Sequence, residues 1–74
     1  MARVRITGLK RGLNKVAMTK TVRLRSGLDL AAAKRRTDSL LAGVAVVVAV
    51  PTREDAQSLA EELIAIGAIA SVVD

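Results

Sequence analysis

Residues 13–34 read LNKVAMTKTVRLRSGLDLAAAK, and they decide how the first half of this 74-residue chain folds. Two stretches with helical spacing, residues 15 to about 25 and residues 30 to about 41, meet at a turn made by Ser26 and Gly27. Glycine commonly ends helices because it takes the left-handed backbone conformation without a steric cost. The stretch therefore predicts two helices joined by a short turn.

Each of these helices follows a residue that is typical of helix N-termini. Asn14 precedes the first helix and Asp29 precedes the second. Their side-chain oxygens can accept hydrogen bonds from the backbone amides that a helix start leaves unpaired. On the first helix, the line through Met18, Val22 and Arg25 is expected to face the core. The second helix is expected to bury Leu30, Ala33, Thr37 and either Leu40 or Leu41.

The other side of the first helix carries cations and is expected to face solvent. Its residues recur at i, i+3, i+4 and i+7, and they are Val16, Thr19, Lys20 and Arg23. On the second helix, Lys34, Arg35 and Arg36 are expected to be exposed. A valine among cations suits a partner helix with apolar and acidic groups, whereas an ordinary solvated face is the alternative interpretation.

The remaining pattern predicts three strands and a third helix. Residues 3–7 alternate polar and apolar as a half-buried strand does, and a basic loop is expected over residues 8–12. Residues 44–50 form a β-branched strand, Thr52 caps a third helix that Gly67 stops, and residues 68–73 form the last strand. The order is β-α-α-β-α-β in a single domain over residues 1–74.

This order predicts an α/β sandwich with a three-stranded antiparallel sheet. The second strand, third helix and last strand form a crossover unit, which makes those two strands parallel. The first strand fits between them and antiparallel to both, and all three helices then cover one face of the sheet. The other face carries Arg3 and Arg5 beside apolar residues of the second strand, so we expect a homodimer through this uncovered face.

Composition excludes several classes of function. The chain has no Cys and no His, which removes disulfides, thiol nucleophiles, imidazole bases and the usual zinc ligands. It has no aromatic residue, so bases cannot stack on aromatic rings. Glu61 and Glu62 are adjacent on a helix and point in different directions, which does not suit a catalytic carboxylate pair. We therefore expect a protein that is not an enzyme and that needs no cofactor or metal.

No targeting or membrane segment is evident in the sequence. Arg3 and Arg5 interrupt the start of the chain, which argues against a signal peptide. The uncharged run over residues 40–50 is about half as long as a membrane span. A cytoplasmic location is expected.

Charge is distributed unevenly along the chain. Residues 1–37 hold eleven of the twelve Lys and Arg and one acid, a net charge of +10. Residues 38–74 hold one Arg and six acids, a net charge of −5. A basic half of this kind attracts anionic partners. An acidic protein is one such partner, and nonspecific DNA or RNA binding is the alternative.

Two sets of residues resemble the signature of a known family, the C-terminal domain of the bacterial ribosomal stalk protein L-seven/L-twelve. The first and longer set is Asn14-Lys15-Val16-Ala17, Lys20, Val22-Arg23, Ser26-Gly27-Leu28, Leu30 and Ala33-Lys34. The second set is Glu54-Asp55-Ala56, Leu59 and Gly67-Ala68. The resemblance spans nearly the whole chain and implies the same three-helix, three-strand fold.

The resemblance also implies a role in translation. In that family the domain recruits translational GTPases through its first two helices. By position, the residues implied to contact a protein partner are Lys15, Val16, Thr19, Lys20, Arg23, Gly27, Leu28 and Lys34. The family's N-terminal dimerisation domain and hinge are not in this sequence, and Met1 lies close to the first strand, so a free-standing homologue is expected. A third interpretation is that the chain is an adaptor of a protease ATPase. It rests only on the loosely similar fold of such adaptors, and no residue motif supports it.

Overall fold

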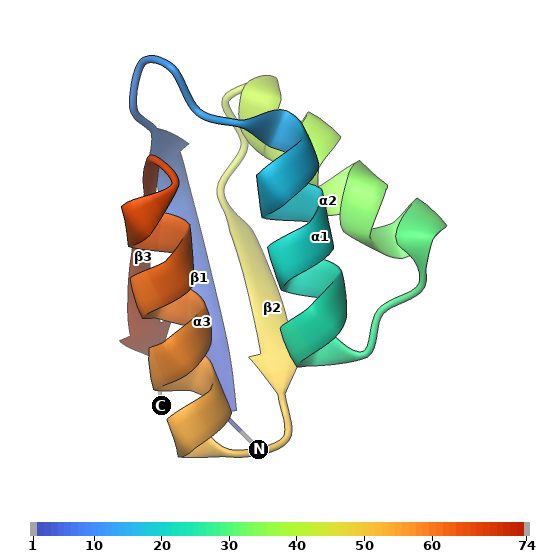
Figure 1. The fold of residues 1–74 in the computed structure, drawn as a ribbon, viewed down its shortest axis with the longest axis vertical. Helices are drawn as coiled ribbons and strands as arrows, with labels where there is room; N and C mark the ends of the chain where they lie inside the picture. Colours follow the sequence, from blue (N-terminus) through green and yellow to red (C-terminus); the bar gives the residue numbers. More distant parts are fainter. Residues whose placement is uncertain (1, 74) are drawn as a thin grey trace.

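The computed structural model describes residues 2–73, which form a three-stranded sheet covered by three helices (Figure 1). The elements follow in the order β1 (Ala2–Leu9), α1 (Lys15–Ser26), α2 (Leu30–Leu41), β2 (Val46–Val50), α3 (Arg53–Ala65) and β3 (Ala68–Val73). This order confirms the predicted β-α-α-β-α-β arrangement and the mixed α/β fold class.

The middle strand, β1, pairs antiparallel with both edge strands, as predicted. Val4 of β1 lies opposite Val48 of β2 and Val72 of β3, and its neighbour Arg5 lies opposite Val47. Because side chains alternate along a strand, the sheet has an inner, apolar face and an outer face that carries the arginines. The helices pack on the inner face (Figure 1).

The core lies between the inner face of the sheet and the helices. Ile6 of β1, Met18 of α1 and Leu59 of α3 have no exposed surface. Burying one such aliphatic side chain stabilises a fold by about 1.5–3 kcal/mol, so a small core of Val, Ile, Leu, Met and Ala can hold a domain of this size. The largest fully buried side chains are Ile6, Met18, Leu59, Leu63, Val4, Val22, Val48 and Val50.

Three strand boundaries differ from the prediction, and the smallest difference is that β1 begins at Ala2 rather than at residue 3. β1 continues to Leu9, so Gly8 and Leu9 are strand residues rather than part of the predicted loop. The pairing register with β3 shifts between Ile6 and Gly8, which marks a bulge that the alternating pattern could not reveal. β2 begins at Val46 rather than at residue 44, because the amide of Val44 still bonds to the carbonyl of α2 residue Ser39 at 3.0 Å.

Two predictions of burial need correction, those for Leu30 and Arg25, and the open choice between Leu40 and Leu41 is decided. Leu30 was expected in the core but is 54% exposed, because the first turn of α2 lies away from the sheet (Figure 1). At the other end of the helix Leu40 is buried, whereas Leu41 is 45% exposed. Arg25 was placed on the core-facing line of α1, yet its guanidinium instead reaches Glu62 of α3. Among residues 2–73, no helix combines the length and the apolar character that a membrane span requires.

Candidate functional site

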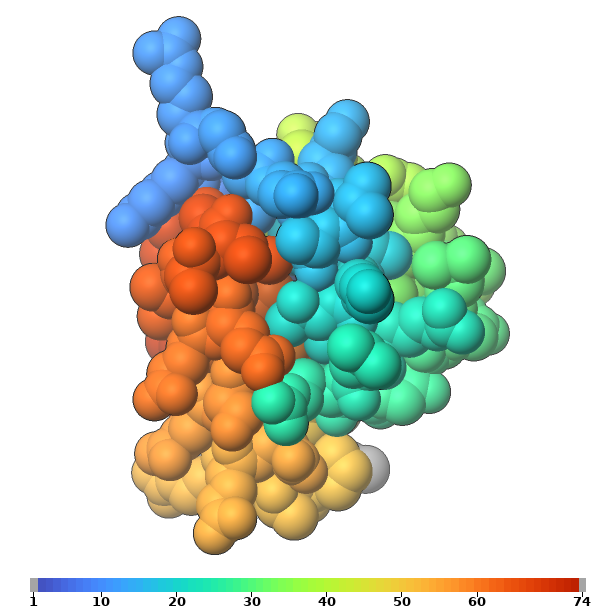
Figure 2. Space-filling model, viewed as in Figure 1, coloured from blue at the N-terminus to red at the C-terminus, as the bar shows by residue number. Residues whose placement is uncertain are grey.

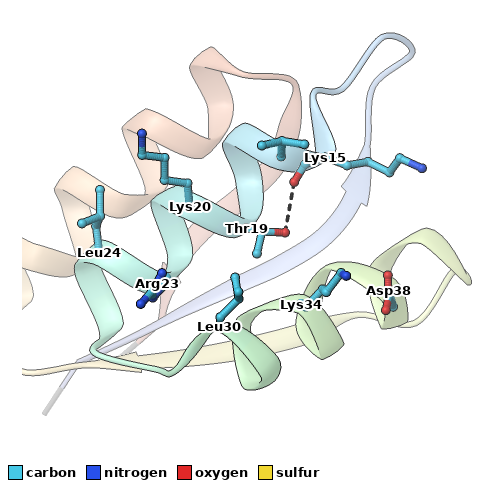
Figure 3. A pocket seen from close by; sticks show the side chains of 9 residues that line it. Lys15, Thr19, Lys20, Arg23, Leu24, Leu30, Lys34 and Asp38 are labelled. Atoms are coloured by element: carbon cyan, nitrogen blue, oxygen red, sulfur yellow. Dashed lines mark hydrogen bonds between the residues drawn. The ribbon is translucent and has the colours of Figure 1, made fainter.

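A groove of about 490 Å³ runs between α1 and α2 on the surface of the domain (Figure 3). Its walls come from the two helices that the Ser26-Gly27 turn connects. Both cationic and aliphatic side chains line it. The residues that line the groove are Lys15, Val16, Thr19, Lys20, Arg23, Leu24, Leu30, Lys34 and Asp38.

Local capping sets where the two helices begin and end. The Oδ1 atom of Asn14 accepts from the amide of Ala17 at 3.1 Å, and the Oδ1 atom of Asp29 accepts from the amide of Ala32 at 2.7 Å. Gly27 has φ of +74°, the left-handed conformation, and its amide donates to the carbonyl of Arg23 at 3.2 Å. Both predicted N-caps and the predicted glycine stop are therefore confirmed, and α2 returns alongside α1.

A pair of hydroxyl groups joins the two helices beneath the groove. Thr19 Oγ1 lies 2.9 Å from Thr37 Oγ1. Each hydroxyl also lies within hydrogen-bond distance of a carbonyl one turn earlier, that of Lys15 at 3.0 Å and that of Ala33 at 3.3 Å. Thr19 was predicted to face solvent, but it is only half-exposed because it turns towards Thr37, which is buried.

Four cations of the groove are open to an outside partner. Lys15, Lys20, Arg23 and Lys34 are exposed and form no ion pair with a carboxylate of residues 2–73. Arg25, two residues after Arg23 on α1, differs because it forms an ion pair with Glu62. The predicted basic face is therefore displayed, with Asp38 as the acidic residue among the groove's lining residues.

The groove also exposes more aliphatic surface than the sequence predicted. Val16 is 78% exposed, Leu24 is 74% exposed and Leu30 is 54% exposed. Leu24 was missed, although it lies two helical turns after Val16 and so on the same side of α1. Leu30 was missed because its spacing also fitted the buried stripe of α2.

Two residues implied by the resemblance lie outside the groove lining. Gly27 forms the turn between the helices, and Leu28 is half-buried and packs against the core. The amide of Leu28 donates to the hydroxyl of Ser26 at 3.3 Å, which helps to hold this turn. These residues shape the groove from its end.

The lining of the groove consists of amines, one guanidinium, one carboxylate, one hydroxyl and aliphatic side chains. The chain lacks Cys and His, and residues 2–73 contain no cluster of three acidic side chains that could hold a metal ion. A second, smaller hollow of about 200 Å³ lies on α2, lined by Ala32, Arg35 and Arg36.

In comparisons with known proteins, no family model and no curated protein sequence matches this chain.

Proposed function

We propose that this chain is a non-enzymatic, cytoplasmic protein-binding domain that docks an acidic, amphipathic partner surface in the groove between α1 and α2. The observation that carries the proposal is the combination of Val16, Leu24 and Leu30, all exposed, with cations that have no carboxylate partner within residues 2–73. An amphipathic helix that lays its apolar side chains into such a groove would place its acidic residues against these cations.

The apolar contacts would supply most of the binding free energy. Full burial of an aliphatic side chain contributes about 1.5–3 kcal/mol, whereas an exposed ion pair contributes about 0.2–1 kcal/mol. The cations would act chiefly on the rate of association and on the choice of an acidic partner. The resemblance to the ribosomal stalk domain suggests a translational GTPase as the class of partner.

Affinity capture tests this proposal. The wild-type chain and the variant Lys20→Glu are immobilised in parallel, and the proteins that each retains from an extract of its own cells are identified by mass spectrometry. We expect Lys20→Glu to lose an acidic partner that the wild type retains. Arg36→Glu is the matched control, because it makes the same change of charge at the second hollow. Equal retention by all three proteins would contradict the proposal.

Nucleic-acid binding is the competing function, and the net charge of +10 on residues 1–37 favours it. A phosphate backbone, however, offers nothing for Leu24 or Val16 to bury. A polyanion complex should weaken steeply with salt, with a slope of about −0.9 per neutralised phosphate on duplex DNA. A gel shift with random duplex DNA and RNA at two salt concentrations separates the two functions.

A further inference from the structure

We infer that the groove between α1 and α2 also takes α3 of a second copy of this chain, so that two copies form a reciprocal dimer in which each groove is closed. The inference rests on the proposed function, because it assigns the same groove a second occupant of the same chemistry. It follows from an acidic, exposed stripe that the chain carries on α3.

The stripe on α3 combines exposed acidic side chains with an exposed aliphatic side chain, which complements the cations and aliphatic side chains of the groove. Glu54, Gln57, Glu61 and Ile64 are all exposed, and their spacing of three, four and three residues places them on one side of the helix. The two glutamates form no ion pair with residues 2–73, and Ile64 is 49% exposed. We call these four residues the outer stripe of α3.

The spacing of charges on the two surfaces is similar. Glu54 and Glu61 are seven residues apart, which is about 10 Å along a helix. Lys15 and Arg23 are eight residues apart on α1, which is about 12 Å. Both glutamates can therefore lie against cations of one groove while Ile64 lies near Val16 or Leu24.

The placement of the two surfaces favours a closed dimer. α1, α2 and α3 lie on the same side of the sheet (Figure 1), and Figure 2 shows atoms of all three helices in one view, with those of α2 at its edge. Two copies that meet through their helical layers can make the groove-to-α3 contact twice about a two-fold axis. Within one copy the contact cannot form, because α3 is held by its own buried side.

The outer face of the sheet is less suited to a second copy. Its middle strand carries Arg3 and Arg5, which form no ion pair with residues 2–73. Two sheets stacked face to face would bring these arginines close to those of the other copy, and like charges repel at short range. The reciprocal helical contact instead joins the acidic half of one copy to the basic half of the other.

Sedimentation equilibrium of four purified variants tests the inference at about 0.15 M salt, where long-range repulsion is screened. The groove variant combines Lys20→Glu with Arg23→Glu, and the α3 variant combines Glu54→Lys with Glu61→Lys. A third variant, Arg35→Glu with Arg36→Glu, matches the charge change of the groove variant outside the groove. The fourth, Arg3→Glu with Arg5→Glu, addresses the sheet face. Circular dichroism confirms that each variant folds.

We expect the mass of the wild type to rise from monomer towards dimer with concentration. The groove variant and the α3 variant alone should each weaken the dimer about tenfold or more, because attractive pairs become repulsive ones. Their equimolar mixture should regain association, since the acidic groove of one then faces the basic α3 of the other. The third and fourth variants should associate as the wild type does.

Three results would overturn the inference: a wild type that stays monomeric at all concentrations, a mixture that stays monomeric, or loss of association in the sheet-face variant alone. The first of these leaves the proposed function untouched, because partner capture is measured separately on immobilised chains. Conversely, the variants can change dimerisation as expected while affinity capture finds no partner. That combination would contradict the proposed function and support the dimer.

Discussion

Arg25 of α1 and Glu62 of α3 form a two-point ion pair, with Nη2 2.6 Å from Oε1 and Nε 3.2 Å from Oε2. The two side chains are 37 residues apart in sequence and both remain partly exposed. The pair connects the helix that forms one wall of the groove to the helix that carries the outer stripe. The hydrogen bonds from Arg25 hold the pKa of Glu62 below its ordinary value, and they raise the pKa of Arg25.

This lowered pKa predicts how stability depends on pH. A carboxyl group whose pKa is lower in the folded state stabilises the fold at pH values above its ordinary pKa of about 4.3, and that contribution is lost as pH falls through the lowered pKa. Glu62→Gln should therefore lower the melting temperature slightly at neutral pH, and the difference from wild type should vanish in acid. Thermal unfolding followed by circular dichroism measures both.

The neighbouring glutamate provides the control for that experiment. Glu61 is exposed and forms no ion pair with residues 2–73, so in dilute solution, where the chain is monomeric, Glu61→Gln should leave the melting temperature nearly unchanged at both pH values. An equal loss in Glu61→Gln and Glu62→Gln would show that the Arg25 pair adds nothing to stability.

The hydroxyl pair beneath the groove predicts a coupling between the two helices. Thr37 is buried and bonded to Thr19, so Thr37→Val should cost about 0.5–1.5 kcal/mol of unfolding free energy. The double variant Thr19→Val, Thr37→Val should cost less than the sum of the two single variants, because it removes both partners together. Urea denaturation of the four proteins gives this cycle, and strict additivity would argue against the coupling.

Substitutions of two valines of α1 should affect stability and partner binding differently. Val22 is fully buried and Val16 is 78% exposed. Val22→Ala should lower the unfolding free energy by about 1–3 kcal/mol, whereas Val16→Ala should change it by less than about 0.5 kcal/mol. In the affinity-capture assay the order should reverse, with Val16→Ala losing partner protein under conditions where both chains are folded. Retention of partner by Val16→Ala at the wild-type level would remove this valine from the docking surface.

Substitutions of Gly27, in the turn between α1 and α2, should lower the unfolding free energy through the backbone conformation alone. Gly27 has φ of +74°, and a Cβ atom added there would meet no heavy atom within 4 Å. Gly27→Ala should therefore cost about 1–2 kcal/mol through the left-handed conformation, and Gly27→Asn should cost less because asparagine tolerates that conformation. Urea denaturation gives both values, and equal costs for the two variants would point to another cause.

Much of the fold could be predicted from the sequence because the relevant signals are local. Asn14, Asp29 and Thr52 cap the helices that follow them, and each side chain bonds to an amide three residues later. Alternation around Val4 and Ile6 places the inner face of β1. The bulge before Gly8 was missed, since it depends on how β3 pairs with β1 and not on the pattern within either strand.

The candidate site was predicted in part. The cations Lys15, Lys20, Arg23 and Lys34 line the groove as expected, because helical spacing and charge identify an exposed face. Leu24, Leu30 and Asp38 were not foreseen as lining residues, because their roles depend on how α2 lies against α1 and how far its first turn extends from the sheet.

The sequence by itself therefore determined the order of the elements, the helix boundaries set by caps and glycine, and the separation of charge between the two halves. These features depend on contacts within a few residues or on composition. Only the tertiary structure decided that Leu30 is exposed while Leu40 is buried, that Arg25 pairs with Glu62, and that α1 and α2 enclose a groove. The physical reason is that burial and pairing between distant residues depend on the relative placement of packed helices, which no local pattern specifies.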